Sequence, residues 1–438
     1  MRVGGRLALL AVAVALAASA CAGEGPSRGG AAGLSGRTTT ITFSIAVSGE
    51  EKAAIQELIS RFENRTSTDV GLDLLTRFRD PPRTRVNLVT SMSSSDLVSR
   101  LRQGDPSERG PHLFAQDNLA LKPLVDEGLV EDLSQIEVPG AVIPSMIPPR
   151  FDGKPFFLPF RPNVRLTYLR KGALGHAGAD PPRTVEDLRN MAQRLAQEMG
   201  KAPLTLSLAE GDPAAVTIAE WVASFGGDPL VLNDDGSLRA FEYLQGLWKD
   251  GLIARESLFA KFDTEIDNLQ SGRAAVAQNW SFTSAVLAQN GRLDDFRVDP
   301  GWKGPVRAVH VIGGDVLGLP RGVTGEQRAA ALGLADFLMS QEAQELLAEK
   351  NTWASIRTDA YGTVPEEVRE TFSAIRQALA DGWFRPSVSY WPDVTAAMTQ
   401  AVDRILLRQE PAKAVLDDLH GQIAAAALEK GAVYPPGR

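Results

Sequence analysis

The sequence predicts an α/β protein in which mostly parallel strands are flanked by helices. One observation is that short β-branched or apolar runs alternate with longer runs of helical periodicity over most of the chain. Another is that the 438 residues are 44% hydrophobic and contain one cysteine, so the fold must depend on a large apolar core rather than on disulfides. The length alone suggests two or three domains.

The alternation is clearest in the first part of the folded chain. Folding should begin near Thr39, because residues 39–47 alternate and are rich in β-branched side chains, which predicts a strand. Ser48-Gly49-Glu50 then opens an amphipathic helix. Further strands are expected at 70–78 and 111–115, and further helices at 96–103 and 118–126. Such an order favours right-handed connections and a mostly parallel sheet.

The middle of the chain continues the pattern. Phe151-Asp-Gly-Lys154 is a turn signal inside a hairpin. Strands are expected on both sides of Arg161-Pro-Asn163, at 156–160 and 164–169. Later strands are expected at 203–208, 274–279 and 309–319, the last being broken by a pair of glycines.

Helices dominate the second half. Thr184, with Asp187 three residues later, is typical of a helix N-terminus, because each side chain can satisfy a free backbone N–H of the other. This helix should reach about Glu198. The other helices are expected at 213–225, 237–249, 324–339, 341–349, 365–381, 392–408 and 411–430.

The N-terminus has the layout of a secretory signal. Arg2 and Arg6 precede an apolar run of roughly 14 residues, fewer than the about 20 that span a membrane. The run ends at Cys21, and Leu16-Ala-Ala-Ser-Ala20 before it resembles the lipobox of bacterial lipoproteins, although the commonest lipobox has leucine in place of Ala18. We expect a signal peptide over 1–20, and a lipidated Cys21 with a flexible Gly/Ser tether over 21–38. The alternative is an ordinary cleaved signal with an incidental cysteine.

Composition excludes several classes of function. The formal net charge is −8, whereas nucleic-acid binding needs a basic face, so no nucleic-acid partner is expected. The histidines lack metal-ligand spacing and no C-x-x-C is possible, so we expect no metal and no other cofactor. No G-x-S-x-G, H-E-x-x-H, Walker or dinucleotide motif occurs. The four histidines are His112, His176, His310 and His420.

A resemblance to a known family rests on four stretches and a late aromatic pair. The stretches are His112-Leu-Phe-Ala-Gln-Asp117, Phe157-Leu-Pro-Phe-Arg-Pro-Asn-Val-Arg-Leu-Thr-Tyr-Leu-Arg-Lys171, Leu269-Gln-Ser-Gly-Arg-Ala-Ala-Val-Ala-Gln-Asn-Trp280 and Val311-Ile-Gly-Gly-Asp-Val-Leu-Gly-Leu-Pro320. Tyr390-Trp391-Pro392-Asp393 follows them. In this order and spacing, over about residues 40 to 430, they resemble the family 1 extracellular solute-binding proteins of sugar-importing ABC systems, which include maltose- and trehalose-binding lipoproteins.

The resemblance implies a two-lobed, type II periplasmic-binding-protein-like fold. Each lobe would be a mixed, mostly parallel sheet flanked by helices, with a helical C-terminal region. Lobe 1 would comprise 39–161 plus 311–345, and lobe 2 would comprise 162–310 plus 346–438. The ligand would lie in the cleft between them, at strand ends and helix starts, and the lobes would close over it by a hinge motion.

The function that the resemblance implies is non-enzymatic. The chain would be a monomeric receptor, lipid-anchored on the extracytoplasmic face of the cell membrane. It would capture a di- or oligosaccharide and deliver this sugar to the transmembrane permease subunits of an ABC importer.

Polar residues near strand ends are the first ligand candidates, because sugar hydroxyls require carboxylates and amides. Asp117 ends a strand and precedes a helix, so its carboxylate could accept two sugar hydroxyls or simply cap the helix. Gln116 and Asn118 flank it, although strand alternation prevents all three from facing the cleft. Glu50 stands at the first strand-to-helix turn, where a carboxylate also suits a helix N-terminus.

The crossing segments supply further candidates. Arg161, Asn163 and Arg165 form a polar run that is hard to explain as core, and the alternative is a salt bridge between lobes. Gly314 lies in a glycine pair that allows close backbone approach. Asp315, next to it, could hydrogen-bond the ligand or hold the hinge.

Flat rings that can stack on a sugar complete the set. Asn279 and Trp280 end a strand at the position where the family has a polar-aromatic pair. Trp221 lies on a helix at core spacing, so packing explains it as well as stacking does. Three late residues are equally candidates for the site or for packing: Trp353, Arg357 and Trp391.

The sequence leaves three alternatives open. A secreted carbohydrate-active enzyme would need paired carboxylates, which Glu50, Asp117 and Asp315 could supply. A surface sensor lipoprotein could use the same fold. An anionic ligand such as a glycerol phosphate is also compatible, since Arg161 and Arg165 match phosphate and carboxylate geometry.

Overall fold

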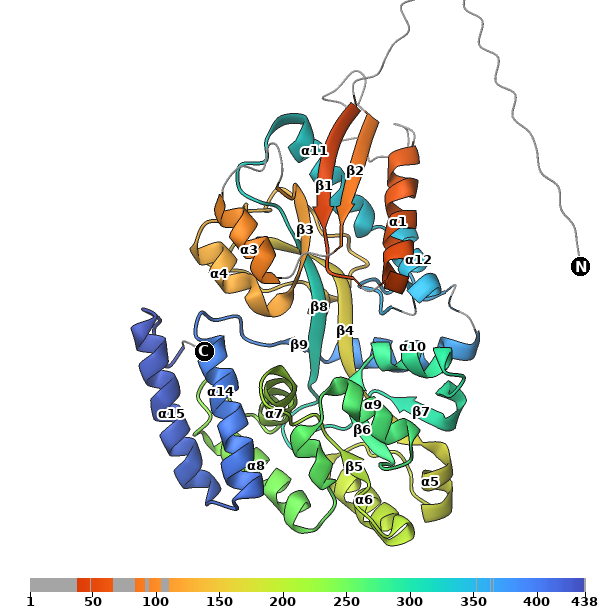
Figure 1. Ribbon diagram of the computed structural model, residues 1–438, viewed down its shortest axis with the longest axis vertical. Coiled ribbons are helices and arrows are strands. Elements are labelled where there is room, and N and C mark those ends of the chain that lie inside the picture. The colour runs from red at the N-terminus through yellow and green to blue at the C-terminus, as the bar shows by residue number, and fades with distance from the viewer. Residues whose placement is uncertain are drawn as a thin grey trace, which may run out of the picture. The chain divides into compact units, whose positions relative to one another are not determined.

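A mixed β-sheet runs through the computed structural model and connects two groups of helices (Figure 1). The structure describes residues 38–47, 49–65, 83–90, 94–103, 110–351, 353–362, 364 and 366–436. The expected signal peptide, Cys21, the tether and the strand at 70–78 lie outside the described residues, and so does the side chain of Glu50.

The strands of the sheet come from all parts of the described chain. They are β1 Thr38–Ser44, β2 Arg83–Val89, β3 Leu113–Asp117, β4 Phe157–Arg170, β5 Leu204–Thr205, β6 Val276–Trp280, β7 Phe296–Asp299, β8 His310–Gly318 and β9 Gly382–Phe384. Their order is β2-β1-β3-β8-β4-β6-β5, with β7 beside β4 and β9 beside β8.

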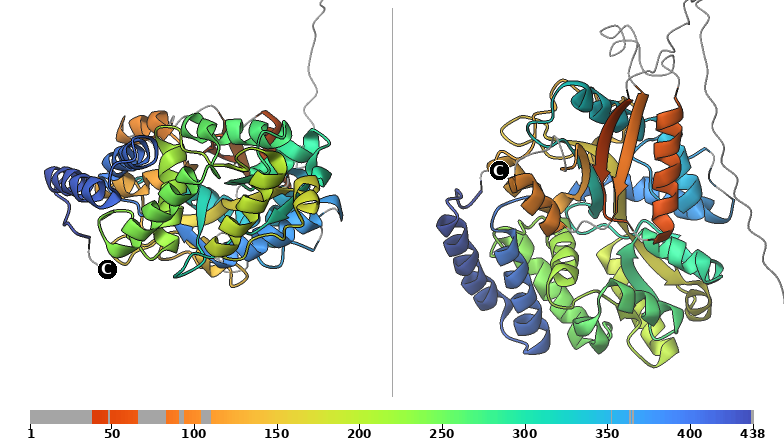
Figure 2. Two further views of the ribbon diagram at one scale, coloured as in Figure 1. Left: turned by 90° about the horizontal axis from the view of Figure 1, so that it is seen from below. Right: turned by 45° about the horizontal axis from the view of Figure 1, so that its top comes forward.

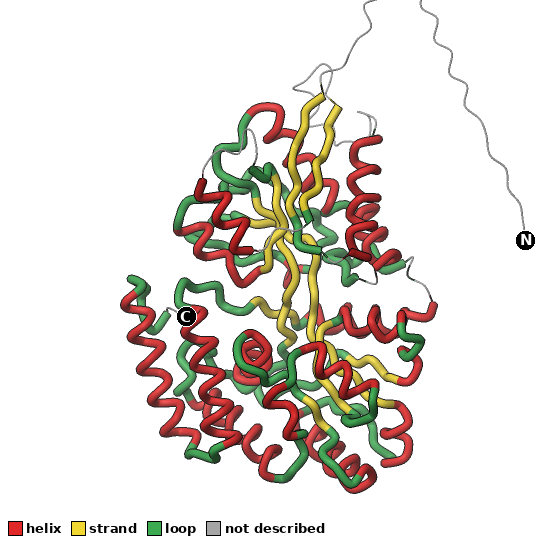
Figure 3. The backbone as a smooth tube through the Cα atoms, in the orientation of Figure 1, coloured by secondary structure: helices red, strands yellow, loops and turns green. Residues whose placement is uncertain are grey.

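Two long strands carry the chain between the lobes. β1 pairs in parallel with β2 and β3; the expected strand-to-helix order favours this pairing for β1 and β3, whereas no strand was expected at 83–89, where β2 lies. β8 pairs antiparallel with both β3 and β4, and β4 continues antiparallel beside β6 and β7. Figure 3 shows β4 and β8 running along the middle of the molecule from one group of strands to the other.

Helices cover both ends of the sheet. They are α1 Gly49–Asn64, α3 Ser94–Gln103, α4 Leu121–Asp126, α5 Lys171–Ala177, α6 Val185–Met199, α7 Asp212–Ser224, α8 Asp235–Lys249, α9 Phe262–Gln270, α10 Phe282–Gln289, α11 Gly325–Leu338, α12 Gln341–Asn351, α13 Arg369–Ala380, α14 Trp391–Ala401 and α15 Ala412–Glu429. α11 and α12 pack against α1, whereas α14 and α15 lie side by side, α14 against α7 and α15 against α8 (Figure 2).

Two large apolar clusters form the core. The first gathers Ile41, Phe43 and Phe160 with the buried side chains of α11 to α13. The second packs α6, α7 and α8 against α14 and α15, and includes Trp221 and Phe241. These buried faces explain why a chain without disulfides folds.

Several local predictions are confirmed. Thr184 accepts a hydrogen bond from the Asp187 N–H, and the Asp187 side chain accepts one from the Thr184 N–H, which makes the expected capping box of α6. Phe151 and Lys154 form an antiparallel bridge around a tight turn. The helices expected at 237–249 and 324–339 correspond to α8 and α11.

Other local predictions were wrong. The two strands expected around Arg161-Pro-Asn163 are one strand, β4, in which the register with β8 shifts between Pro159 and Arg161. This irregularity lets prolines remain in a strand interior. The strand expected at 203–208 shortens to β5, and the helix expected at 392–408 splits into α14 and a π-helical turn, Val402–Leu407.

Candidate functional site

Arg161 on β4 connects elements that are far apart in the sequence. Its Nε donates to Asp315 Oδ2 on β8 at 3.0 Å, and its Nη1 donates to Glu51 Oε1 on α1 at 3.0 Å. Its guanidinium also lies over the ring of Trp353, 4.4 Å from the ring centroid. Arg161 is therefore bound between two carboxylates and covers an aromatic face.

A hollow of about 190 Å³ lies beside this arginine. Elements of both helix groups supply its walls: α1, the crossing strands β4 and β8, the start of α10 and the loop after α12. Its lining residues are Glu51, Arg161, Pro162, Asn163, Ser281, Phe282, Gly314, Trp353 and Ala354. Carboxylate, guanidinium, amide, hydroxyl and aromatic groups thus converge on one small space, as in sites for small solutes.

Glycine is required where β4 and β8 cross. Gly314 has a φ of +85°, and a Cβ there would lie 2.1 Å from the Arg161 carbonyl oxygen. At Gly313, a Cβ would lie 2.8 Å from the Trp280 ring. The glycine pair therefore brings the two strands, Arg161 and Trp280 close together.

Asp117 lies close to this site, and its carboxyl group has a raised pKa. In the sheet it is opposite Asp315, and its Oδ1 accepts the Leu119 N–H at 2.9 Å. Burial raises the pKa of Asp117 to about 6; Arg385 and the Leu119 N–H oppose the rise, and nearby carboxylates add to it. The expected cap is therefore present, and burial favours the protonated form of this carboxyl.

Arg385 supplies the positive charge that opposes the rise in the pKa of Asp117. It lies just after β9, its side chain is almost fully buried, and its Nη1 donates to Asp212 Oδ1 at the start of α7 at 2.8 Å. Its Nε has no hydrogen-bond partner among the described residues.

Arg165 points away from the hollow into a buried polar cluster. Its side chain is fully buried, with Nε 3.8 Å from Glu220 Oε2 on α7. The same Glu220 oxygen accepts the Val311 N–H of β8 at 3.1 Å. Burial raises the pKa of Glu220 to about 7 and that of Glu265 to about 8, and Arg165 opposes both rises. This cluster ties α7 to the crossing strands.

The polar neighbours of the hollow are held by hydrogen bonds. Ser281 Oγ donates to Asn163 Oδ1 at 2.7 Å, so the amide is fixed at the lining. Asn118 Nδ2 donates to the Ile312 carbonyl at 3.0 Å, and Gln116 is buried within β3. Asn279 accepts the Trp280 N–H and donates to the Phe262 carbonyl.

The aromatic candidates lie in different places. Trp353 lines the hollow although it is only 8% exposed, and Trp280 is 5% exposed and packs edge-on against Phe262. Trp221 stacks on Tyr243 inside the second apolar cluster, to which Trp391 also belongs. Arg357 pairs with Asp359 and donates to the Met339 carbonyl. The structure thus brings Arg161, Asn163, Gly314, Asp315 and Trp353 together; a ligand role for any candidate remains a prediction.

Sequence reasoning missed several residues of the site. Glu51 directly follows the candidate Glu50. Two adjacent acids in a sequence do not show which of them a helix turns toward the crossing strands. Ser281 and Phe282 directly follow Trp280, so continuing that segment could have found them. Arg385 carries no motif, because only the path of the chain after β9 brings it to Asp117.

The described residues exclude two features. Among them, no group of three or more His, Cys, Asp or Glu side chains is placed to hold a metal ion. No helix in the described ranges has both the length and the apolar character needed to cross a bilayer.

The two-lobed sheet with a polar hollow at its crossing strands is the fold of solute-binding proteins. Residues 80–372 match the family of bacterial extracellular solute-binding proteins, so the chain belongs to this family. The family binds solutes without converting them, and the chain is accordingly not an enzyme. No curated protein sequence matches the chain.

Solved structures of sugar-binding proteins share the fold. The sugar-binding protein MalE of Xanthomonas citri is 15% identical, with a TM-score of 0.76, and the match covers 90% of this chain and 98% of that one. A cyclic alpha-maltosyl-1,6-maltose binding protein from Arthrobacter globiformis is 19% identical, with a TM-score of 0.72 and coverage of 89% and 99%. Maltose-bound MalE3 of T. maritima is 20% identical, with a TM-score of 0.69 and coverage of 88% and 99%.

Proposed function

We propose that this chain captures a neutral di- or oligosaccharide in the cleft beside Arg161 and delivers it to the permease of an ABC importer. The observation that carries the proposal is the hollow at the crossing strands, where Arg161, which Asp315 holds, meets Glu51 and Trp353. Membership of a solute-binding family and the maltose-type proteins among its structural relatives support the same class of ligand.

The lining offers the groups that a sugar needs. Glu51 can accept hydrogen bonds from hydroxyls, as can Asp315, which binds Arg161 but is not itself a lining residue. Asn163 and Ser281 can both donate and accept them. Trp353, which is 8% exposed and has Arg161 over one face, would meet the C–H side of a pyranose ring with the part of its ring that lines the hollow. The hollow of about 190 Å³ is smaller than the about 300–1,000 Å³ usual for ligand sites. We infer that it receives one ring and that a second ring lies toward Asp117.

The charges favour a neutral solute over an anionic one. Arg161 is already paired with two carboxylates, and Arg385 is paired with Asp212. When Asp117 is included with these partners, the groups around the hollow comprise more carboxylates than guanidinium groups. A phosphate or carboxylate ligand would have to displace an existing ion pair, whereas hydroxyls can share the existing acceptors.

Closure and delivery complete the proposed cycle. Lobe 1 comprises 39–161 plus 311–345 in this proposal, lobe 2 comprises 162–310 plus 346–438, and the crossing strands act as the hinge. Lipidation at Cys21, with the tether to residue 38, would hold this monomeric receptor beside the permease on the extracytoplasmic face of the membrane.

Isothermal titration calorimetry with mono-, di- and oligosaccharides and sugar phosphates tests the ligand. We expect one neutral sugar to bind, and Asp315→Asn or Trp353→Ala to weaken binding at least about tenfold, the loss of one charge-assisted contact or stacking face. Asp393→Asn, which removes a carboxylate paired with Lys430 on the C-terminal helices, is the matched control and should bind normally. Binding of sugar phosphates or carboxylates alone would contradict the proposed ligand class.

A further inference from the structure

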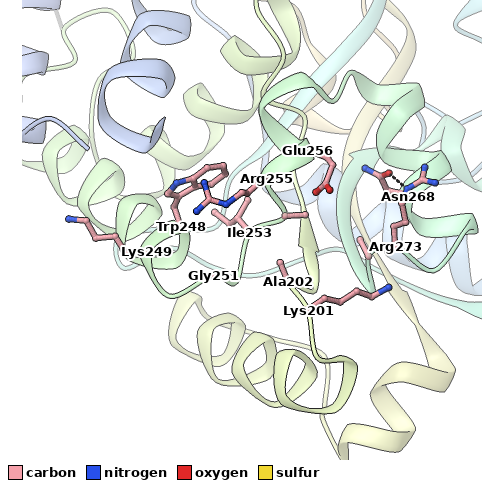
Figure 4. Close-up of a pocket in the computed structure, with 12 residues that line it drawn as sticks. Lys201, Ala202, Trp248, Lys249, Gly251, Ile253, Arg255, Glu256, Asn268 and Arg273 are labelled. Carbon is pink, nitrogen blue, oxygen red and sulfur yellow. Dashed lines mark hydrogen bonds between the residues drawn. The ribbon is translucent and has the colours of Figure 1, made fainter. Parts of the chain in front are cut away.

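A second and larger hollow lies away from the cleft, near β5. Its volume is about 410 Å³, and it shares no lining residue with the hollow beside Arg161. The end of α8, the loop before β5, the 3₁₀ turn Arg255–Phe259 and the turn after α9 surround it (Figure 4). Its lining includes small and apolar residues, among them Ala202, Gly251 and Ile253.

The rim of this hollow is strongly basic in a chain whose net charge is −8. Lys201, Lys249, Arg255 and Arg273 line it, against a single acid, Glu256. A concave surface lined by one sign of charge concentrates its field and attracts ions of the opposite sign. The excess of positive charge therefore suits an anionic occupant.

The four cations have neutral partners. Lys201 Nζ donates to the Gly272 carbonyl at 2.8 Å, and Lys249 Nζ donates to Gln245 Oε1 at 3.1 Å. The Arg255 guanidinium lies 5.6 Å from the centroid of the Trp248 ring. These contacts position the groups without neutralising their charges.

Arg273 is oriented by a buried amide. Its Nε donates to Asn268 Oδ1 at 2.8 Å, and Asn268, only 4% exposed, donates through Nδ2 to Thr205 Oγ1 at 3.2 Å. Within the part of the chain that the structure describes, no hydrogen bond uses the two Nη atoms of Arg273. A guanidinium that is held through Nε presents the edge formed by its two Nη atoms for bidentate contact with an oxyanion.

The cations lie on opposite sides of the hollow. Figure 4 shows Arg255 next to Trp248 on one side and Lys201 and Arg273 on the other, whereas the Lys249 side chain extends outward from the rim. A ligand that contacts the cations on both sides needs more than one anionic group.

We propose that this hollow is a binding site for a multivalent, phosphate-bearing anion, separate from the solute cleft. One phosphate group contacts Arg273 and Lys201, and a second contacts Arg255, with Lys249 adding positive charge at the rim. The ligand is either a free phosphate compound or the head group of an anionic phospholipid, since both offer the same oxygens. This site is independent of the solute that the cleft takes.

Inorganic pyrophosphate is the probe for the free form. Calorimetric titration of the full chain, in neutral detergent and at low ionic strength, should show binding. The double substitution Arg255→Gln and Arg273→Gln should weaken it at least about tenfold, because two charge-assisted contacts are lost. The matched control, Lys171→Gln with Arg183→Gln, removes two exposed cations of the same lobe and should bind pyrophosphate as the native chain does.

Vesicles test the head-group source. Native chain and double variant are sedimented with phosphatidylcholine vesicles with or without phosphatidylglycerol. The amount of protein that sediments with each kind of vesicle is compared. If phosphatidylglycerol increases this amount for the native chain but not for the double variant, the site binds a lipid head group. Equal pyrophosphate binding by native chain, double variant and control would overturn the proposal, and so would binding to neither probe. A folded double variant is verified by an unchanged sugar titration and melting temperature.

Discussion

Arg161 shows how one side chain can join three parts of this fold. Its carboxylate partners, Asp315 and Glu51, lie 154 and 110 positions away in the sequence. Both ion pairs are mostly shielded from water, so they are screened less than surface pairs. A polar residue on an apolar crossing segment was predictable; the identity of its partners was not, because it depends on the register of β4 with β8.

The carboxyl of Asp117 predicts a pH-dependent stability. Its pKa is about 6 in the folded chain and close to 3.8 when unfolded, so the folded state binds the proton more tightly. Stability therefore falls as the pH rises from about 4 to 6, and the full penalty remains above that. We expect Asp117→Asn to raise the free energy of unfolding by about 1 kcal/mol or more at pH 7.5, and to make no difference near pH 4. Melting temperatures between pH 4 and 8 measure this.

Asp359 provides a control of opposite sign. A hydrogen bond from Arg357 holds the pKa of Asp359 below its usual range. Neutralising this acid by Asp359→Asn should lower stability at neutral pH, and the loss should vanish as the pH falls through the pKa of Asp359 in the folded chain. A parallel shift of both variants would show that burial does not control Asp117.

At the scale of elements, the crossing of β4 and β8 determines the site. The β4 strand pairs with β8 on one side and with β6 on the other, so Arg161, Asn163 and the end of β6 face the same region. Gly313 and Gly314 allow this because a side chain at either position would collide with Trp280 or with the β4 backbone.

Gly314→Ala should therefore be severely destabilising. Alanine at a φ of +85° is strained, and its Cβ would meet the Arg161 carbonyl, so we expect a loss of about 3 kcal/mol or more in the free energy of unfolding. Gly140→Ala, which places its Cβ in open space, should change it by less than about 0.5 kcal/mol. Urea unfolding curves give both values. Equal losses for the two variants would mean that the strand crossing tolerates a side chain.

At the scale of the whole molecule, one apolar cluster extends across both ends of the crossing strands. The first apolar cluster contains Ile41 and Phe43 of β1 together with Leu166 and Tyr168 near the far end of β4. Two lobes joined only by linkers would melt separately. Here the shared strands couple them.

We expect calorimetry to show a single unfolding transition. A bound solute should move this transition as a unit, because a ligand present at about 1,000 times its dissociation constant adds about 4 kcal/mol to the free energy of unfolding. Two separate peaks, with only one moved by the ligand, would contradict coupling through β4 and β8.

The local patterns of the sequence predicted much of the fold. Amphipathic periodicity and capping residues found most of the helices, and Thr184 marked the start of α6 correctly. Predictions were wrong where tertiary pairing overrides local signals. Proline at 162 suggested a break, but pairing with β8 on one side and β6 on the other keeps β4 continuous.

The sequence by itself determined the α/β class, the strand-to-helix order, the glycine pair and the polar character of the crossing segment, because these depend on neighbours within a few positions. Only the tertiary structure decided which candidates share one hollow. It brought Glu51, Arg161 and Trp353 together, turned Arg165 into a buried cluster and placed Arg385 beside Asp117. The reason is physical: side chains far apart in the chain meet through strand register and helix packing, which are properties of the whole core.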